Sequence, residues 1–439
     1  MNGGVAYVST RDPTRRPVGF ETALQRGLAP DGGLYVPAWV PALPAGWEAA
    51  RGWGEVIEAV LRPWFDPSDA DAWVDDALAA LDFPVPTRPL GPDTALLELH
   101  HGPTLAFKDV AARTMGRWVG RSLRRRGERA TVLVATSGDT GGAVADGFQG
   151  IDALRVVVLY PAGRVSPVQE RQLTMPRPGV FALAVEGDFD ACQRLAKAAL
   201  VDPALADLQL TSANSINVGR LLPQATYHVW GLLQWSRACG VAPSEVWSVV
   251  PSGNLGNLAA ALLAAAMGAR PAGLVAAHNA NDHFPRVLLG SARPEEAPDT
   301  VATLSNAMDV GAPSNLERLV HLFPDGAYPV PVRGVSVDDE GTLASMRRCW
   351  RDHGVTVCPH TAVGLEALAR LRGGVEPVVE GPALVLATAH PAKFPEVVAQ
   401  ALPGVDATHP ALEAMPSARP TARIAAESAA LVDWLRRAL

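Results

Sequence analysis

Lysine is scarce in this chain, and one of its lysines stands where amine chemistry is plausible. Among 439 residues, lysine occurs only at Lys108, Lys197 and Lys393. Lys108 lies in HGPTLAFKDVAAR (residues 101–113), directly before an amphipathic pattern that predicts a helix. Apolar neighbours disfavour an ammonium ion, so Lys108 is a candidate for forming an imine (a Schiff base) with a carbonyl compound. The alternative is a surface lysine that extends its charge into water.

A glycine turn at residues 251–257, PSGNLGN, follows a predicted strand and precedes a predicted helix. Backbone N–H groups and the start of a helix attract an anion at such a turn. The turn has neither the dinucleotide-binding pattern nor the lysine of a nucleotide-binding loop. An ordinary strand-to-helix turn remains open. The candidate phosphate ligands are Gly253, Asn254, Leu255, Gly256 and Asn257.

Two further stretches carry polar groups suited to anions. TSGDTGG (residues 136–142) has small residues and side chains that could surround a carboxylate, although a capped turn is equally possible. NSINVGRLLPQ (residues 214–224) brings hydroxyl and amide donors close to an arginine, which suits a phosphate, with a solvated helix start as the alternative. The candidates are Ser137, Asp139 and Thr140 in the first stretch, and Ser215, Asn217 and Arg220 in the second.

The stretch ATAHPAKF (residues 387–394) follows an apolar strand, and Thr388 places a neutral hydroxyl at its carboxyl end. Ligands bind at this end of the strands in parallel sheets. Lys393 is expected in the following helix, in a structural or salt-bridging role. Together, a lysine, two phosphate-sized sites, a carboxylate-sized turn and a neutral hydroxyl suit pyridoxal phosphate, with Thr388 against the pyridine nitrogen.

The elements that must position these groups alternate from about residue 94 onward. Short apolar runs alternate with helical patterns, which predicts an α/β fold of mostly parallel sheets covered by helices on both faces. Residues 1–90 do not show this alternation, and we expect a small N-terminal α+β domain there. Residues 91–439 then form a core of two α/β subdomains with the active site between them. The predicted strands are 131–137, 154–161, 180–187, 246–252, 273–279 and 383–390.

Composition narrows the class of protein. The formal net charge of −7 gives no electrostatic reason to expect nucleic acid binding. The four cysteines are scattered, with no C-x-x-C pair, and the histidines lack metal-ligand spacing, so no metal site is expected. The N-terminus lacks a signal-peptide pattern, and no apolar run is long enough to span a bilayer. We expect a cytoplasmic protein that binds neither membrane nor nucleic acid.

A series of short stretches resembles, in order, the motifs of the threonine synthase family, within the fold-type-II group of pyridoxal-phosphate enzymes. YVSTRDP (residues 7–13) and GLAPDGGLYVP (residues 27–37) resemble the family's N-terminal domain, and HGPTLAFKD resembles its cofactor-lysine motif. The remaining matches are TSGDTGG, YPAGRVSPVQERQ (residues 160–172), NSINVGRLLPQ, PSGNLGN, NAMDVGAPSN (residues 306–315), PHTAVG (residues 359–364) and TAHPAKF.

The resemblance implies a lyase that converts O-phospho-L-homoserine and water to L-threonine and phosphate, the last step of threonine biosynthesis. The reaction is a γ-elimination followed by β-addition of water. Lys108 would hold the cofactor and act as the base, and the 253–257 loop and Thr388 would bind the cofactor. Ser137, Asp139 and Thr140 would hold the substrate carboxylate region. Ser215, Asn217, Arg220 and Arg164 would hold its phosphate. We expect a monomer or homodimer.

Two features depart from the family pattern or leave room for another function. Cys358 stands before PHTAVG, where the family often has an acidic residue, and its role is open. A serine/threonine dehydratase or a phospho-amino-acid lyase of the same fold group is an alternative enzyme. A non-catalytic protein that binds a phospho-amino acid is an alternative of another class, although the presence of Lys108 argues against it.

Overall fold

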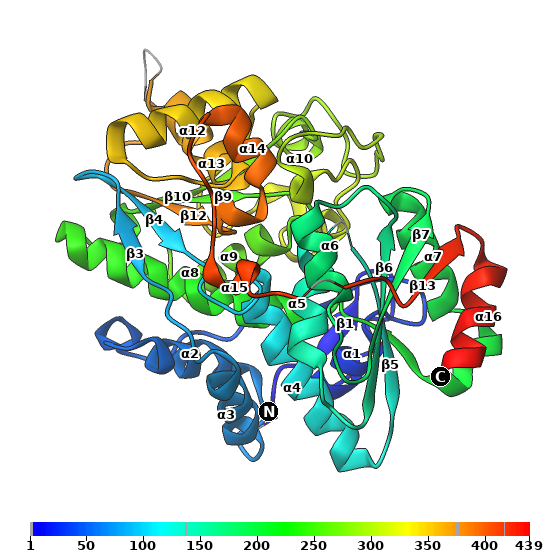
Figure 1. Ribbon diagram of the computed structural model, residues 1–439. Helices are drawn as coiled ribbons and strands as arrows, with labels where there is room; N and C mark the ends of the chain where they lie inside the picture. Colours follow the sequence, from blue (N-terminus) through cyan, green and yellow to red (C-terminus); the bar gives the residue numbers. More distant parts are fainter. Residues whose placement is uncertain (1–2, 137, 374–376, 417) are drawn as a thin grey trace.

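The computed structural model describes residues 3–136, 138–373, 377–416 and 418–439. These residues form a two-stranded, a six-stranded and a five-stranded sheet. In Figure 1 the six-stranded sheet lies at the upper left, the five-stranded sheet at the right, and the N-terminal segment, in blue, below the six-stranded sheet. The two larger sheets are mostly parallel, as the predicted α/β fold class requires.

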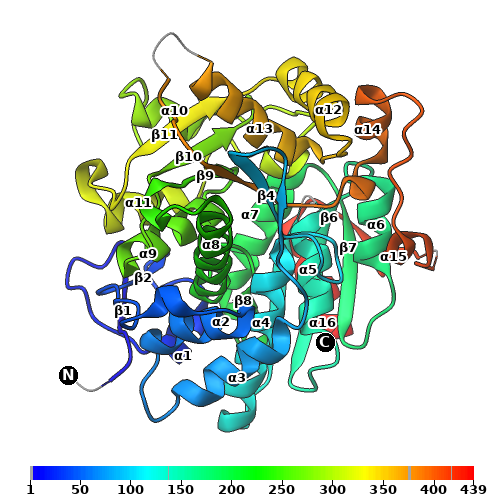
Figure 2. The same cartoon turned by 90° about the vertical axis from the view of Figure 1, so that its left-hand side faces the viewer.

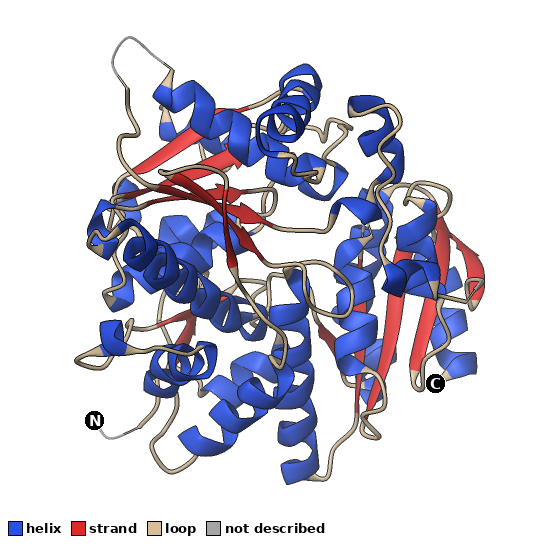
Figure 3. Ribbon diagram, turned by 60° about the vertical axis from the view of Figure 1, so that its left-hand side comes forward, coloured by secondary structure: helices blue, strands red, loops and turns tan. Residues whose placement is uncertain are grey.

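The six-stranded sheet is parallel except at one edge. Its order is β11 (Val332–Ser336), β10 (Gly273–His278), β9 (Trp247–Pro251), β12 (Ala383–Ala387), β4 (Thr94–Glu98) and β3 (Thr87–Pro89). Only the β3–β4 pair is antiparallel. Figure 3 shows helices on both faces of this sheet. They are α8 (Val218–Cys239) and α9 (Gly256–Met267) on one face, and α12 (Asp339–His353), α13 (Pro359–Arg372) and α14 (Pro395–Ala401) on the other. The short helix α10 (His283–Leu288) packs against the edge strand β11, on the face of α8 and α9.

The five-stranded sheet is parallel throughout. Its order is β13 (Ala422–Ala425), β7 (Val180–Glu186), β6 (Leu154–Pro161), β5 (Ala130–Ala135) and β8 (Leu210–Ser212). Its central strands are buried on both faces, as expected for apolar, β-branched runs between two helical layers. The helices are α4 (Lys108–Arg126), α5 (Asp139–Phe148) and α6 (Pro167–Thr174) on one face, and α7 (Phe189–Leu200) and α16 (Ser428–Ala438) on the other.

The N-terminal segment packs against the helix that begins at Lys108. Its elements are β1 (Tyr7–Ser9), β2 (Tyr35–Pro37), α1 (Phe20–Arg26), α2 (Trp53–Leu61) and α3 (Ala70–Ala80), and Figure 2 shows the helices beside α4 and α8. Phe20, Phe65 and Trp73 pack around Trp118 of α4, with ring centroids 5.0–6.3 Å apart. Trp118 Nε1 donates to the Trp73 carbonyl at 2.8 Å. The segment therefore supports α4 from behind.

All six predicted strands are present, with ends that differ from the prediction by at most three residues. The sequence did not indicate β4, β8, β11 or β13, which are three to five residues long. The expected domain boundary at residue 90 falls inside the β3–β4 hairpin, because β3 belongs to the six-stranded sheet. Pro89 is tolerated there because β3 is an edge strand. The remaining helices are α11 (Asn315–Leu322) and α15 (Pro410–Glu413).

Candidate active site

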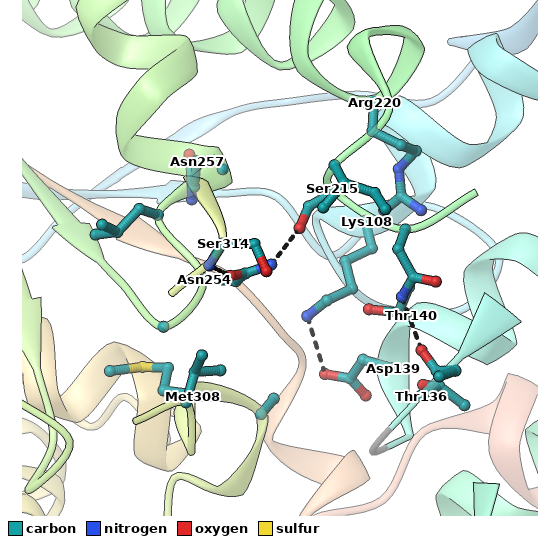
Figure 4. A pocket seen from close by; sticks show the side chains of 18 of the residues that line it. Lys108, Thr136, Asp139, Thr140, Ser215, Arg220, Asn254, Asn257, Met308 and Ser314 are labelled. Atoms are coloured by element: carbon teal, nitrogen blue, oxygen red, sulfur yellow. Dashed lines mark hydrogen bonds and ion pairs between the residues drawn. The ribbon is translucent and has the colours of Figure 1, made fainter. Parts of the chain in front are cut away.

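A cavity of about 150 Å³ lies between the two larger sheets. It is lined by residues that follow the carboxyl ends of four strands: Thr136 after β5, Asn214 after β8, Ser252 after β9 and Thr388 after β12. Because parallel strands place their carboxyl ends at one edge, turns far apart in the sequence meet here. Figure 4 shows the side chains that converge on this cavity from both sides.

Lys108 is the first residue of α4 and points into the cavity (Figure 4). Its side chain is 15% exposed, and Nζ lies 4.7 Å from the centre of the Phe107 ring. Burial is the main cause that lowers the pKa of Lys108, to about 8; Asp139 raises it, whereas Lys393 and Arg220 lower it further. A lysine in this setting carries a much larger neutral fraction near neutral pH than an ordinary lysine, as an imine-forming amine requires.

Asp139 lies opposite Lys108 and is almost fully buried. Its Oδ2 is 4.0 Å from Lys108 Nζ, and its Oδ1 is 2.9 Å from Lys393 Nζ. Gln169 also donates to Oδ1, at 3.1 Å. Burial opposes ionisation of Asp139, but the two lysines outweigh it and hold its pKa below the usual value. The salt-bridging role expected for Lys393 is confirmed, although the residue lies in a short 3-10 turn (Pro391–Lys393) rather than inside a helix.

The 253–257 loop forms one end of the cavity, and all five predicted residues line it. A side chain at Gly253 would place its Cβ 2.8 Å from Met308 Cα, so the close approach of the two backbones requires glycine. Leu255 adopts the left-handed conformation, with φ at 60°, directly before α9 begins. Among the described side chains, the buried Nδ2 of Asn257 has no hydrogen-bond partner. The loop thus forms a narrow cradle with an unused donor.

Ser215 and Arg220 form a second polar group in the cavity. Ser215 Oγ accepts hydrogen bonds from Asn254 Nδ2 at 2.7 Å and Asn315 Nδ2 at 3.3 Å, so its own proton is free to donate. Arg220 is 3% exposed and donates from Nη1 to the Ala213 carbonyl at 2.8 Å. Within the described part of the chain, no carboxylate lies within 4.0 Å of its guanidinium. A buried cation without an ionic partner is suited to an anionic ligand.

Arg318 holds this end of the cavity together from outside it. The residue is fully buried in α11, and Nη2 donates to the carbonyls of Ile216 at 2.7 Å and Tyr35 at 3.2 Å. Nη1 donates to the Ser215 carbonyl at 3.3 Å and to Asn315 Oδ1. The guanidinium therefore fixes the Ser215 loop to α11 and to the N-terminal segment.

Thr388 and His360 complete the wall of the cavity. Thr388 is 5% exposed, and its carbonyl accepts from the backbone N–H of Phe107, which ties β12 to the start of α4. His360 Nε2 accepts from Ala307 N at 3.1 Å, which leaves Nδ1 as the proton-bearing nitrogen. Burial lowers the pKa of His360 to about 4, so the ring is neutral near neutral pH.

Two of the described residues predicted to bind substrate do not line the cavity, and a third falls outside the described residues. Asn217 caps α8 instead: it accepts from Gly219 N and donates to the carbonyls of Leu24 and Ser212, and it does not line the cavity. The structure thus places the Asn217 side chain at the N-cap of α8 and not in the cavity lining. Arg164 is exposed and also lies outside the cavity lining. Ser137 falls outside the described residues.

Sequence reasoning missed several polar residues of the site. Asn214 and Gln224 flank the predicted Ser215 and Arg220, and Ser314 and His360 come from stretches matched only as family motifs. Their polar types in NSINVGRLLPQ, NAMDVGAPSN and PHTAVG are the signal in the sequence that pointed to them. No group of three or more His, Cys, Asp or Glu in the described residues could hold a metal ion, and no helix there is long and apolar enough to cross a membrane.

Comparisons with known proteins agree on one family. The family model of pyridoxal-phosphate dependent enzymes matches residues 88–383, that of the threonine synthase N terminus residues 6–73, and that of the threonine synthase C-terminal region residues 361–432. The chain is 42% identical to a threonine synthase of Serratia marcescens over 398 residues and 38% identical to that of Escherichia coli over 397 residues. Each alignment covers 87% of both chains.

Solved structures give the same result. The crystal structure of threonine synthase from Escherichia coli matches with a TM-score of 0.88 and 34% identity, covering 99% of this chain and 100% of that one. The structure of PLP-bound threonine synthase from Brucella melitensis matches with a TM-score of 0.84, 34% identity and 99% coverage of both chains. Maize serine racemase, 14% identical with a TM-score of 0.52, shares the fold alone. The chain therefore belongs to the threonine synthase family of pyridoxal-phosphate-dependent enzymes.

Proposed function

We propose that this chain converts O-phospho-L-homoserine and water to L-threonine and phosphate, with pyridoxal phosphate as its cofactor and Lys108 as its catalytic residue. One observation carries the assignment of the site: a buried lysine stands in one cavity with two separate groups that suit phosphates. A phosphorylated cofactor and a phosphorylated substrate account for both groups. A dehydratase, whose substrate has no phosphate, would need only one.

The cavity fits pyridoxal phosphate on features of its own residues. The 253–257 cradle is too narrow for a Cβ at Gly253 and presents the unpaired Nδ2 of Asn257, which suits a phosphate. Lys108 is the amine for the cofactor aldehyde, and the Thr388 hydroxyl suits the ring nitrogen. The chemistry that pyridoxal phosphate supplies when bound is delocalisation of the electron pair left by a departing proton.

Lys108 handles protons at the substrate carbons. Burial lowers the pKa of the free amine of Lys108 to about 8 in this cavity. It is therefore neutral often enough to remove the proton from Cα and, once charged, to return it. The neutral Thr388 hydroxyl, in place of a carboxylate, leaves the ring nitrogen less protonated, which we propose favours elimination over transamination.

The two ends of the substrate are held by different groups. Arg220 and Ser215 bind its phosphate, and we add Asn214, which lines the same wall, to this proposal. Thr140, in the first turn of α5, lines the opposite part of the cavity and binds its carboxylate. Asp139 lies close by, but its negative charge repels a carboxylate and its oxygens face two lysines. We therefore assign Asp139 to Lys108 and Lys393 rather than to the substrate carboxylate.

The Schiff-base lysine is tested by measuring both products. Purified protein with bound cofactor is incubated with O-phospho-L-homoserine, and threonine and phosphate are followed together for the native chain and for Lys108→Ala. We expect equal release of both products from the native chain and a loss of at least about 1000-fold in the variant. Phosphate released with a keto acid in place of threonine would contradict the proposal in favour of a lyase of the same fold.

We further propose that the enzyme is cytoplasmic and acts as a monomer or homodimer. The four cysteines are unpaired, and three of them are buried, which agrees with a reducing compartment. Size-exclusion chromatography with light scattering tests the oligomeric state.

A further inference from the structure

The Asp139 carboxylate stands between two lysines that come from different parts of the fold. Lys108 begins α4 and reaches Oδ2 at 4.0 Å (Figure 4). Lys393 follows β12 and reaches Oδ1 at 2.9 Å from the side away from the cavity. The Lys108 side chain is 15% exposed, whereas that of Lys393 is wholly buried. Two of the chain's three lysines thus share one carboxylate.

Lys393 is fixed in place by more than this ion pair. Its Nζ also donates to the Thr104 carbonyl at 2.8 Å, and its backbone N–H donates to the His390 carbonyl at 3.1 Å. Burying an ion pair costs desolvation that a methionine of similar size would avoid, so such a pair is poor evidence for stability alone. The ion pair between Lys393 and Asp139 lies directly behind the wall of the active site, where its charges can act on the proton of Lys108.

Among the charged groups around Asp139, Lys393 makes the shortest contact with it, at 2.9 Å. Asp139 is held by hydrogen bonds from Gln169 and Lys393 on one oxygen and faces Lys108 across the cavity with the other. His360 is neutral because burial lowers its pKa to about 4. The titratable and charged groups that act on this cluster are Lys108 and Asp109 of α4, Arg220 of α8, and Cys358 and His360 at the start of α13.

Charge balance decides whether Lys108 keeps its proton. A carboxylate beside a lysine stabilises the ammonium form, and a second cation beside that carboxylate cancels much of the effect. With Lys393 in place, Lys108 faces a nearly neutral pair. Without Lys393, it would face a single buried carboxylate and would hold a proton more tightly.

We propose that Lys393 is a positioning residue that neutralises Asp139, so that Asp139 orients the amine of Lys108 without holding a proton on it. This inference rests on the proposed function, in which Lys108 carries the cofactor. Lys393 does not touch the cavity and acts only through Asp139.

The test is a pH titration of the cofactor absorbance band, without substrate, which follows the proton on the Lys108 nitrogen while that nitrogen is joined to the cofactor; the same charges act on it there. It compares the native holoenzyme with Lys393→Met and with the double variant Asp139→Asn/Lys393→Met. We expect the midpoint pH of this absorbance change to rise by about one pH unit or more in Lys393→Met. The reason is that a positive charge has been removed beside an intact carboxylate. In the double variant, which has no unbalanced charge, the midpoint should return to within about 0.3 units of the native value.

The double variant is the matched control, because it carries the same methionine. It also removes the risk of a misfolded protein, since it leaves no buried carboxylate without its cation. A midpoint in the double variant displaced as far as in Lys393→Met, or no displacement in either, would overturn the proposal. The pH at which cofactor-free protein takes up pyridoxal phosphate half-maximally should follow the same order. Neither measurement depends on threonine formation, so failure of the proposed reaction would be seen separately.

Discussion

The two anion sites in the cavity are built from different groups. The 253–257 loop offers backbone N–H groups, a helix start and the neutral amides of Asn254 and Asn257. The site at residues 214–220 offers the buried guanidinium of Arg220 with the Ser215 hydroxyl. Fixed dipoles suit a phosphate that stays bound, whereas a full charge suits a phosphate that must be drawn in and released with each turnover. The sites thus match a resident cofactor and a transient substrate.

Arg220→Met would break the substrate site and spare the cofactor site. We expect kcat/KM for O-phospho-L-homoserine to fall by about 100-fold or more, since a buried charge–phosphate contact contributes about 3 kcal/mol. The cofactor absorbance should be retained. Steady-state kinetics measures kcat/KM, and an absorbance spectrum of each variant measures the bound cofactor. Arg164→Met is the matched control, and the exposed position of Arg164 predicts a change below about twofold.

Gly253→Ala would break the cofactor site and spare the substrate site. The added Cβ would lie 2.8 Å from Met308 Cα, so the loop must move and its N–H groups lose their alignment. We expect cofactor affinity to fall by about tenfold or more, with the KM for substrate within about twofold once cofactor is saturating. Equilibrium titration with pyridoxal phosphate measures the cofactor affinity. A raised KM with unchanged cofactor affinity would reverse the assignment of the two sites.

Asn217→Ala tests whether a residue next to the substrate site contributes to stability or to substrate binding. The side chain caps α8 and makes no contact with the cavity, so its loss should lower the free energy of unfolding by about 2 kcal/mol. The KM should change by less than about threefold, because Ser215 and Arg220 remain. Urea unfolding and steady-state kinetics separate the two effects. A tenfold higher KM at unchanged stability would restore Asn217 to the phosphate site.

The sequence predicted those parts of the site that local patterns define. The 253–257 loop and Thr388 follow apolar strands directly, so their place at the carboxyl ends could be inferred without a structure. The polar types of Ser215 and Asn217 could not reveal which one faces the cavity, because an Asn at a helix N-cap and an Asn in a binding site look alike in sequence. The carboxylate shared by Lys108 and Lys393 depends on packing between the two subdomains, which no local pattern encodes.

The most direct test of the central claim is the fate of oxygen from water. If the enzyme cleaves the carbon–oxygen bond at Cγ and adds water at Cβ, turnover of O-phospho-L-homoserine in ¹⁸O-labelled water places one label in the threonine hydroxyl and none in the phosphate. Mass spectrometry of the two products resolves these positions. Label in the phosphate, with homoserine as the other product, would show hydrolysis of the phosphate ester and would contradict the account.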